Sequence, residues 1–129
     1  MVLAVVLLPT VGCGGSGDST DAGGPPVSLS GTTNDHGTKT ARAKLEMELD
    51  DFYFGPTFVE ASAGQNFTIE LENEGTAQHT FTSTDLGIDV QLEPGQKKTV
   101  TVTAPRSGVA LFMCRFHQNQ GMQGAVFVP

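Results

Sequence analysis

The sequence predicts an all-β protein, an antiparallel β-sandwich with Greek-key connections. Three observations support this fold class: short segments in which apolar and polar residues alternate, turns rich in Gly, Pro and Asn between them, and the lack of helical periodicity. Alternation with a period of two is the pattern of a strand that buries one face. About seven such strands with regular turns are typical of a sandwich.

The first two strands show the clearest alternation. Leu45, Met47 and Leu49 alternate with charged or acidic residues. Residues 67–72 repeat this pattern, and Asn73-Glu74-Gly75 then supplies a turn. The apolar residues of both segments are expected to face one core.

The second half of the sequence continues in strands. Alternation over 88–92 is followed by Glu93-Pro94-Gly95-Gln96, which has Pro at the second turn position, and then by renewed alternation over 99–103. We interpret these two segments as a hairpin. Further short strands are expected at 52–54, 58–59, 78–84, 109–114 and 124–128.

The N-terminal third has a different composition. Met1 to Leu8 is apolar but too short to span a bilayer, so it fits the core of an export signal. Residues 14–38 are mainly Gly, Ser, Thr, Asp and Pro, a composition typical of a linker. We therefore expect a signal peptide at 1–12, a lipidated cysteine with a flexible linker at 13–42, and one folded domain at 43–129.

The residues just before Cys13 form a recognisable motif. Thr10-Val11-Gly12-Cys13 resembles the cleavage box of bacterial lipoproteins, in which the cysteine is lipidated and becomes the first residue. This resemblance implies lipidation of Cys13 and export to the cell membrane. The domain would then face the periplasm or the cell exterior.

The charge balance excludes one class of function. Seven Lys and Arg against fourteen Asp and Glu give a net charge of -7, which argues against a nucleic acid partner. Acidic residues alternate over 46–51 and 70–74, as on the solvated face of a strand. Docking of a basic redox partner there is the alternative interpretation.

Metal-binding residue types gather near the C-terminus. Cys114, His117 and Met122 lie within nine residues between two predicted strands, where a loop can surround an ion. His79 lies on another predicted strand, with Phe81 on the same inward face. Thiolate and thioether favour Cu(I), and imidazole suits both copper oxidation states. We therefore expect His79, Cys114, His117 and Met122 to form a site for a soft or borderline metal ion.

The spacing Cys-x2-His-x4-Met-x-Gly-x-Val at 114–126 resembles the cupredoxin family, especially plastocyanin-like and halocyanin-like blue-copper proteins. The similarity covers 43–129. It implies one type 1 copper ion with His79, Cys114 and His117 in the trigonal plane and Met122 as the weak axial ligand.

The same resemblance implies a one-electron carrier whose partners are redox proteins such as a cytochrome, an oxidase or a reductase. His117, flanked by Phe116, would be the electron port. Two positions depart from the family pattern: Thr80 stands where many relatives carry Asn, and Phe116 stands where plastocyanins carry Pro.

Other functions fit the residues less well. A binuclear copper site needs two cysteines in one loop, and a multicopper enzyme needs more histidines than the three present. We therefore expect no enzyme activity. Separately, we expect the protein to be a monomer. Zinc could use Cys114 and the two histidines, but Met is a poor zinc ligand. Two alternatives stay open: a periplasmic copper-handling module without redox shuttling, and a metal-free β-sandwich interaction domain.

Overall fold

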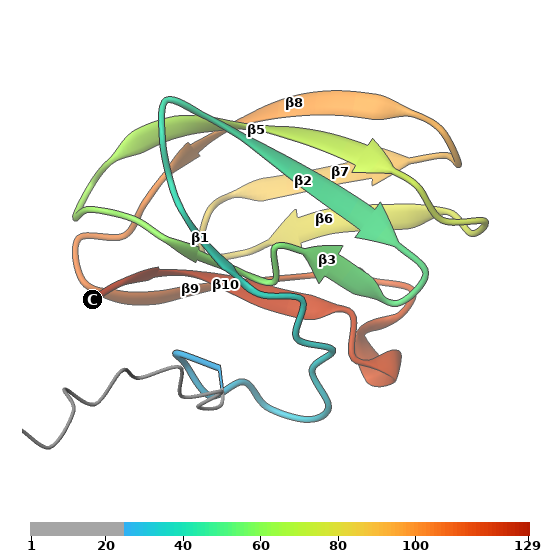
Figure 1. The fold of residues 1–129 in the computed structure, drawn as a ribbon, viewed down its shortest axis with the longest axis horizontal. Helices are drawn as coiled ribbons and strands as arrows, with labels where there is room; N and C mark the ends of the chain where they lie inside the picture. Colours follow the sequence, from blue (N-terminus) through green and yellow to red (C-terminus); the bar gives the residue numbers. More distant parts are fainter. Residues whose placement is uncertain (1–24) are drawn as a thin grey trace, which may run out of the picture.

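Two β-sheets stack face to face in residues 25–129, the part of the chain that the computed structural model describes (Figure 1). The predicted signal peptide at 1–12 and the lipidation site Cys13 lie outside these residues. None of the described residues forms a helix long and apolar enough to cross a membrane. The strands are β1 (Thr38–Thr40), β2 (Lys44–Asp50), β3 (Tyr53–Gly55), β4 (Phe58–Glu60), β5 (Asn66–Asn73), β6 (His79–Ser83), β7 (Ile88–Leu92), β8 (Lys97–Thr103), β9 (Gly108–Met113) and β10 (Gln123–Val128), with one 3-10 turn, η1 (Gln118–Gln120).

The strand order defines a six-stranded and a four-stranded sheet. The larger sheet has the order β1-β4-β10-β9-β6-β7, and the smaller has the order β3-β2-β5-β8. The predicted β-sandwich is confirmed. Both sheets are mixed, because β4 pairs in parallel with β1 and β10, and β2 pairs in parallel with β5.

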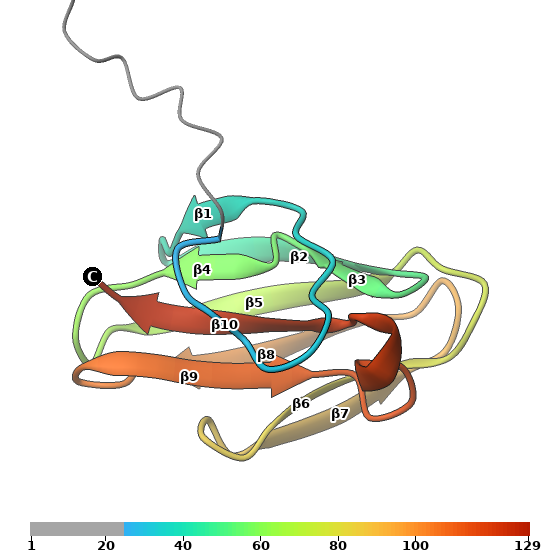
Figure 2. The same ribbon diagram turned by 90° about the horizontal axis from the view of Figure 1, so that it is seen from below.

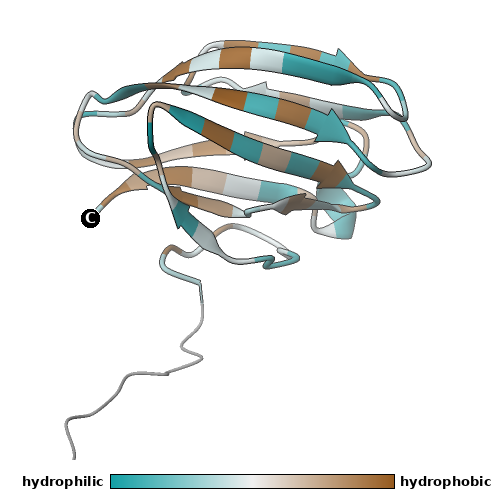
Figure 3. Cartoon of the chain, turned by 45° about the horizontal axis from the view of Figure 1, so that its top comes forward, coloured by the Kyte–Doolittle hydropathy of each residue, from teal (hydrophilic) through white to brown (hydrophobic). Residues whose placement is uncertain are grey.

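The core lies between the sheets and follows the alternation of the sequence. Bands of hydrophobic and hydrophilic residues alternate along the strands in Figure 3. At the centre, the ring of Phe54 meets those of Phe81 and Phe112 at centroid distances of 5.9 and 5.0 Å. Because these three rings are almost fully buried, they fix the spacing of the two sheets beside the predicted metal ligands.

The expected hairpin over 88–103 is wrong. β7 pairs with β6 in the larger sheet, whereas β8 pairs with β5 in the smaller one, so the Pro94-Gly95 turn crosses between sheets. Asn73 stabilises this crossing: its carbonyl accepts from Gly95 N–H at 2.8 Å, and its Nδ2 donates to Leu92 O at 2.9 Å. Both strands are amphipathic towards the same core, so alternation alone could not tell a hairpin from a crossing.

Residues 27–36, here called the strap, pack on the outer face of the larger sheet. Figure 2 shows the strap crossing β10 and approaching the turn that contains η1. Val27 and Leu29 contact a cluster formed by Phe58, Ala125 and Phe127. Their composition predicts that these residues belong to the linker at 13–42. Two isolated apolar residues in a polar segment gave no strand-like pattern, although they cover an apolar surface made by distant strands.

Candidate metal centre

The loop of residues 114–122, here called the ligand loop, connects β9 to β10. Its ends are joined by a bond from Cys114 N–H to Met122 O at 3.0 Å. Inside the loop, His117 O accepts from Met122 N–H at 3.2 Å and from Gln120 N–H at 3.0 Å. These bonds place Cys114, His117 and Met122 at the same end of the sandwich.

Gly121 allows the ligand loop to close. Its φ of +92° lies in the left-handed region, where side chains are strained. A Cβ at this position would also approach the side chain of Asn34 to 2.8 Å. Asn34 belongs to the strap, and its Nδ2 donates to Gln120 O at 2.9 Å. The strap therefore supports the ligand loop from outside.

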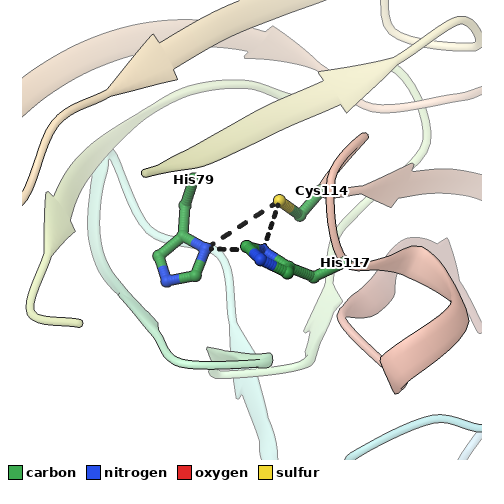
Figure 4. Close-up of side chains that lie close together, drawn as sticks. All are labelled: His79, Cys114 and His117. Atoms are coloured by element: carbon green, nitrogen blue, oxygen red, sulfur yellow. Dashed lines mark hydrogen bonds between the residues drawn. The ribbon is translucent and has the colours of Figure 1, made fainter. Parts of the chain in front are cut away.

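Three of the predicted ligands converge, as Figure 4 shows. His79 is the first residue of β6, and its Nδ1 lies 3.2 Å from His117 Nδ1 and 3.9 Å from Cys114 Sγ. Cys114 Sγ lies 3.5 Å from His117 Nδ1. The point in their plane that is equidistant from the three atoms lies about 2.1 Å from each of them. This distance is close to metal–nitrogen and metal–thiolate bond lengths of roughly 2.0–2.3 Å. One ion can therefore contact all three atoms.

Met122 is the fourth predicted ligand. Its side chain is fully buried, and its backbone bonds to both Cys114 and His117. Two imidazoles, one thiolate and one thioether form the donor set of a type 1 copper site. The residues present therefore fit copper.

The surroundings of Cys114 favour its thiolate form. Burial raises the pKa of this thiol, but the neighbouring imidazole of His79, backbone N–H groups and the imidazole of His117 lower the pKa by more, to about 6. The N–H of Thr80 lies 3.4 Å from the sulfur. A thiolate is the form that ligates a metal, so the site is prepared for binding.

Thr80 also joins β6 to the ligand loop. Its hydroxyl accepts a bond from Arg115 N–H at 2.9 Å. This residue departs from the family pattern, and here it supplies one contact to the Cys114 sulfur and one to the next residue, Arg115. The sequence pattern alone indicates no role for Thr80.

His117 lies at the edge of the site. Its ring meets the ring of Phe52 edge-on, with centroids 4.9 Å apart, and that of Phe116 at 6.3 Å. His117 is partly exposed, and Phe116 is 47% exposed. Phe52 has a φ of +77°, an uncommon conformation for a residue with a side chain. The half-buried ring of Phe52 and the exposed ring of Phe116 thus flank the one predicted histidine ligand that solvent reaches.

A carboxylate that the sequence pattern did not reveal contacts His79. Asp51 was interpreted as one of several solvated acidic residues, yet its Oδ1 lies 3.1 Å from His79 Nε2. Hydrogen bonds from the hydroxyl and N–H of Thr76, then from Ala77 N–H and His79, lower the pKa of Asp51 despite the opposing effect of burial. Asp51 is adjacent to β2 in sequence, but its partners come from 76–79, so no local pattern could have revealed this pair.

The remaining acidic residues on β2 and β5 behave as expected for a solvated face. Lys44 pairs with Glu70 at 2.9 Å, and Lys97 lies 3.7 Å from Glu72, in both cases with exposed lysines. The Tyr53 hydroxyl donates to Glu48 and Asp50. Surface pairs of this kind contribute little stability.

A β-sandwich with a buried His, Cys and Met set at one end defines a mononuclear metal-binding protein of the copper type. The sequence profile of the cupredoxin-like domain matches residues 27–128. The chain belongs to this family, and the match includes the strap.

Solved structures share the fold at low sequence identity. A reduced auracyanin from Roseiflexus castenholzii is 20% identical, with a TM-score of 0.58 over 69% of this chain and 98% of that chain. Auracyanin A, a blue copper protein from Chloroflexus aurantiacus, is 22% identical, with a TM-score of 0.55 over 72% and 100%. A chain of a heme-copper terminal oxidase dimer is 20% identical, with a TM-score of 0.57 over 80% and 76%. No curated protein sequence matches the chain.

Proposed function

We propose that this protein is a type 1 copper protein that carries single electrons at the outer face of a membrane. The observation that carries the proposal is the convergence of His79 Nδ1, Cys114 Sγ and His117 Nδ1 on one point. When bound, copper supplies a Cu(II)/Cu(I) couple at this point. The family and the blue copper auracyanin with the same fold support this role.

The surrounding residues suit electron transfer. His79 and Cys114 are fully buried, and they are held by β6 and by the bonded ends of the ligand loop. A rigid donor set limits rearrangement between oxidation states. The partly exposed His117, between Phe52 and Phe116, offers an edge at which a redox partner can approach. We assign no catalytic activity to the protein, because an electron carrier requires no substrate site.

The location follows from the proposal for Cys13. Lipidation there would anchor the chain to the cell membrane, with the domain facing the periplasm or the cell exterior as a monomer. The partner would be a membrane-associated cytochrome, oxidase or reductase. The fold shared with a chain of a heme-copper terminal oxidase supports an oxidase as one such partner.

The test is the visible absorption and electron paramagnetic resonance of the protein after addition of Cu(II), beside Cys114→Ser. We expect an intense thiolate-to-copper band in the native protein, bleached reversibly by ascorbate, and no such band in the variant. The full chain is used because the strap bonds to the ligand loop. Colourless copper binding would favour the copper-handling alternative, and absence of binding would favour the interaction domain. Either result would overturn the proposal.

A further inference from the structure

The two ring nitrogens of His79 have different surroundings. Nδ1 faces Cys114 Sγ and His117 Nδ1, whereas Nε2 lies 3.1 Å from Asp51 Oδ1. A carboxylate is a hydrogen-bond acceptor, so the pair requires the proton on Nε2. That tautomer leaves the lone pair of Nδ1 free on the side where the other donor atoms lie.

Asp51 is itself fixed by a loop. Both carboxylate oxygens lie 3.1 Å from Thr76 N, Oδ2 accepts from the Thr76 hydroxyl at 2.7 Å, and Oδ1 accepts from Ala77 N–H at 3.2 Å. The side chain of Asp51 is 30% exposed, while that of His79 is fully buried. The carboxylate is therefore oriented before any metal binds.

Gly75, in the same loop, lies close against both Asp51 and His79. A Cβ on Gly75 would lie 2.3 Å from Asp51 Oδ1 and 2.7 Å from His79 Nε2, distances that a real side chain cannot adopt. Asn73 Oδ1 accepts from Gly75 N–H at 2.9 Å and holds the backbone in place. Glycine is needed here for space, since its φ is not positive.

We propose that Asp51 is a positioning residue for the copper site. It holds His79 in the tautomer that presents Nδ1 to the metal, and its negative charge stabilises Cu(II) relative to Cu(I). The charge effect follows because reduction of Cu(II) removes one positive charge from the site. His117 lacks an equivalent partner, because no carboxylate in residues 25–129 lies within ion-pair distance of it. This proposal rests on the proposed copper function.

The size of the charge effect can be bounded. A carboxylate separated from the metal by one imidazole ring is roughly 8 Å away, and an effective dielectric constant between about 20 and 80 suits a partly exposed group. Removal of the charge is then expected to shift the Cu(I):Cu(II) equilibrium about 2- to 30-fold towards Cu(I). A tenfold shift corresponds to about 59 mV for one electron, so the reduction potential rises by about 20 to 90 mV.

The experiment compares Asp51→Asn and Asp51→Ala with Glu74→Gln. Asp51→Asn removes the charge but keeps an oxygen that can accept the bond from Nε2. Asp51→Ala removes both. Glu74→Gln removes an equal charge from the neighbouring exposed loop without touching His79, so it is the matched control. The reduction potential is measured by spectroelectrochemical titration, and the His79 tautomer by nitrogen NMR of the metal-free protein.

We expect both Asp51 variants to have a raised potential, Glu74→Gln to change it by much less, and Asp51→Ala alone to lose the single Nε2–H tautomer. Equal potentials in Asp51→Asn and Glu74→Gln would overturn the charge effect. A native protein with the proton on Nδ1 would overturn the positioning role, even if Asp51→Ala failed to fold. If the native protein lacked the thiolate-to-copper band, the proposed function would fail, while the tautomer measurement would still decide the role of Asp51.

Discussion

Replacement of Asn34 by alanine tests whether the strap is part of the folded domain. The Nδ2 of Asn34 donates to Phe52 O at 2.7 Å and to Gln120 O at 2.9 Å, so one side chain joins the strap to two segments beside the metal ligands. A hydrogen bond contributes about 1 kcal/mol net, and less when exposed. Because the bond to Gln120 is exposed, we expect Asn34→Ala to lower the free energy of unfolding by about 1 to 2 kcal/mol.

The assay is urea denaturation of the metal-free protein followed by far-ultraviolet circular dichroism. For a chain of this size the denaturant slope is about 1 to 2 kcal/mol/M, so the midpoint should fall by roughly 0.5 to 2 M. Thr32→Ala is the control, because its exposed side chain carries no bond to the domain; it should change stability by less than about 0.5 kcal/mol. Equal midpoints for Asn34→Ala and Thr32→Ala would refute the reasoning. The strap would then be part of the linker and not of the folded domain.

Three further outcomes follow from the same contacts. Phe112→Ala removes one of the three central rings and should lower the free energy of unfolding by about 3 to 5 kcal/mol, measured by the same denaturation; a loss below about 1 kcal/mol would contradict the core described above. Gly121→Ala combines left-handed strain with a clash against the strap, so it should reduce Cu(II) affinity in a competition titration, and unchanged affinity would show that the loop adjusts freely. A hydrogen bond from the Thr82 hydroxyl and, after it, one from the Arg115 guanidinium lower the pKa of Asp89. The carboxylate therefore stabilises the folded protein above its unfolded pKa near 4, and this stabilisation is lost as the pH falls through the lower folded pKa. Asp89→Asn should therefore reduce the slope of the free energy of unfolding against pH in the acid range. An unchanged slope would show that Asp89 does not contribute to the loss of stability in acid.

The sequence predicted features that depend on near neighbours in the chain. Alternation revealed the strands, and the spacing within 114–122 revealed three candidate ligands because one loop carries them. His79 could be added because its strand faces inward. The sheet crossing at Pro94-Gly95 could not be predicted, since a turn between two amphipathic strands has the same pattern whichever sheet each strand joins.

Asp51 shows most clearly what the sequence could not provide. In sequence it is one of a run of acidic residues, and composition favours solvation for all of them. In the structure it differs from its neighbours because it contacts Thr76, Ala77 and His79, which follow it by 25 to 28 residues in the chain. Such a role depends on a long-range contact, and a single sequence contains no record of it.

The centre is held by four segments that are distant in sequence: the strap, the turn after β2, the loop before β6 and the ligand loop. Each segment bonds to at least one other, through Asn34 to the ligand loop and to the turn, and through Asp51 to the loop before β6. Movement of one donor atom therefore strains bonds in several segments at once. If copper is bound as proposed, this shared restraint would limit the rearrangement of the donor atoms between its two oxidation states. Weakening any one segment should consequently alter the potential and the rate of electron exchange before it abolishes copper binding.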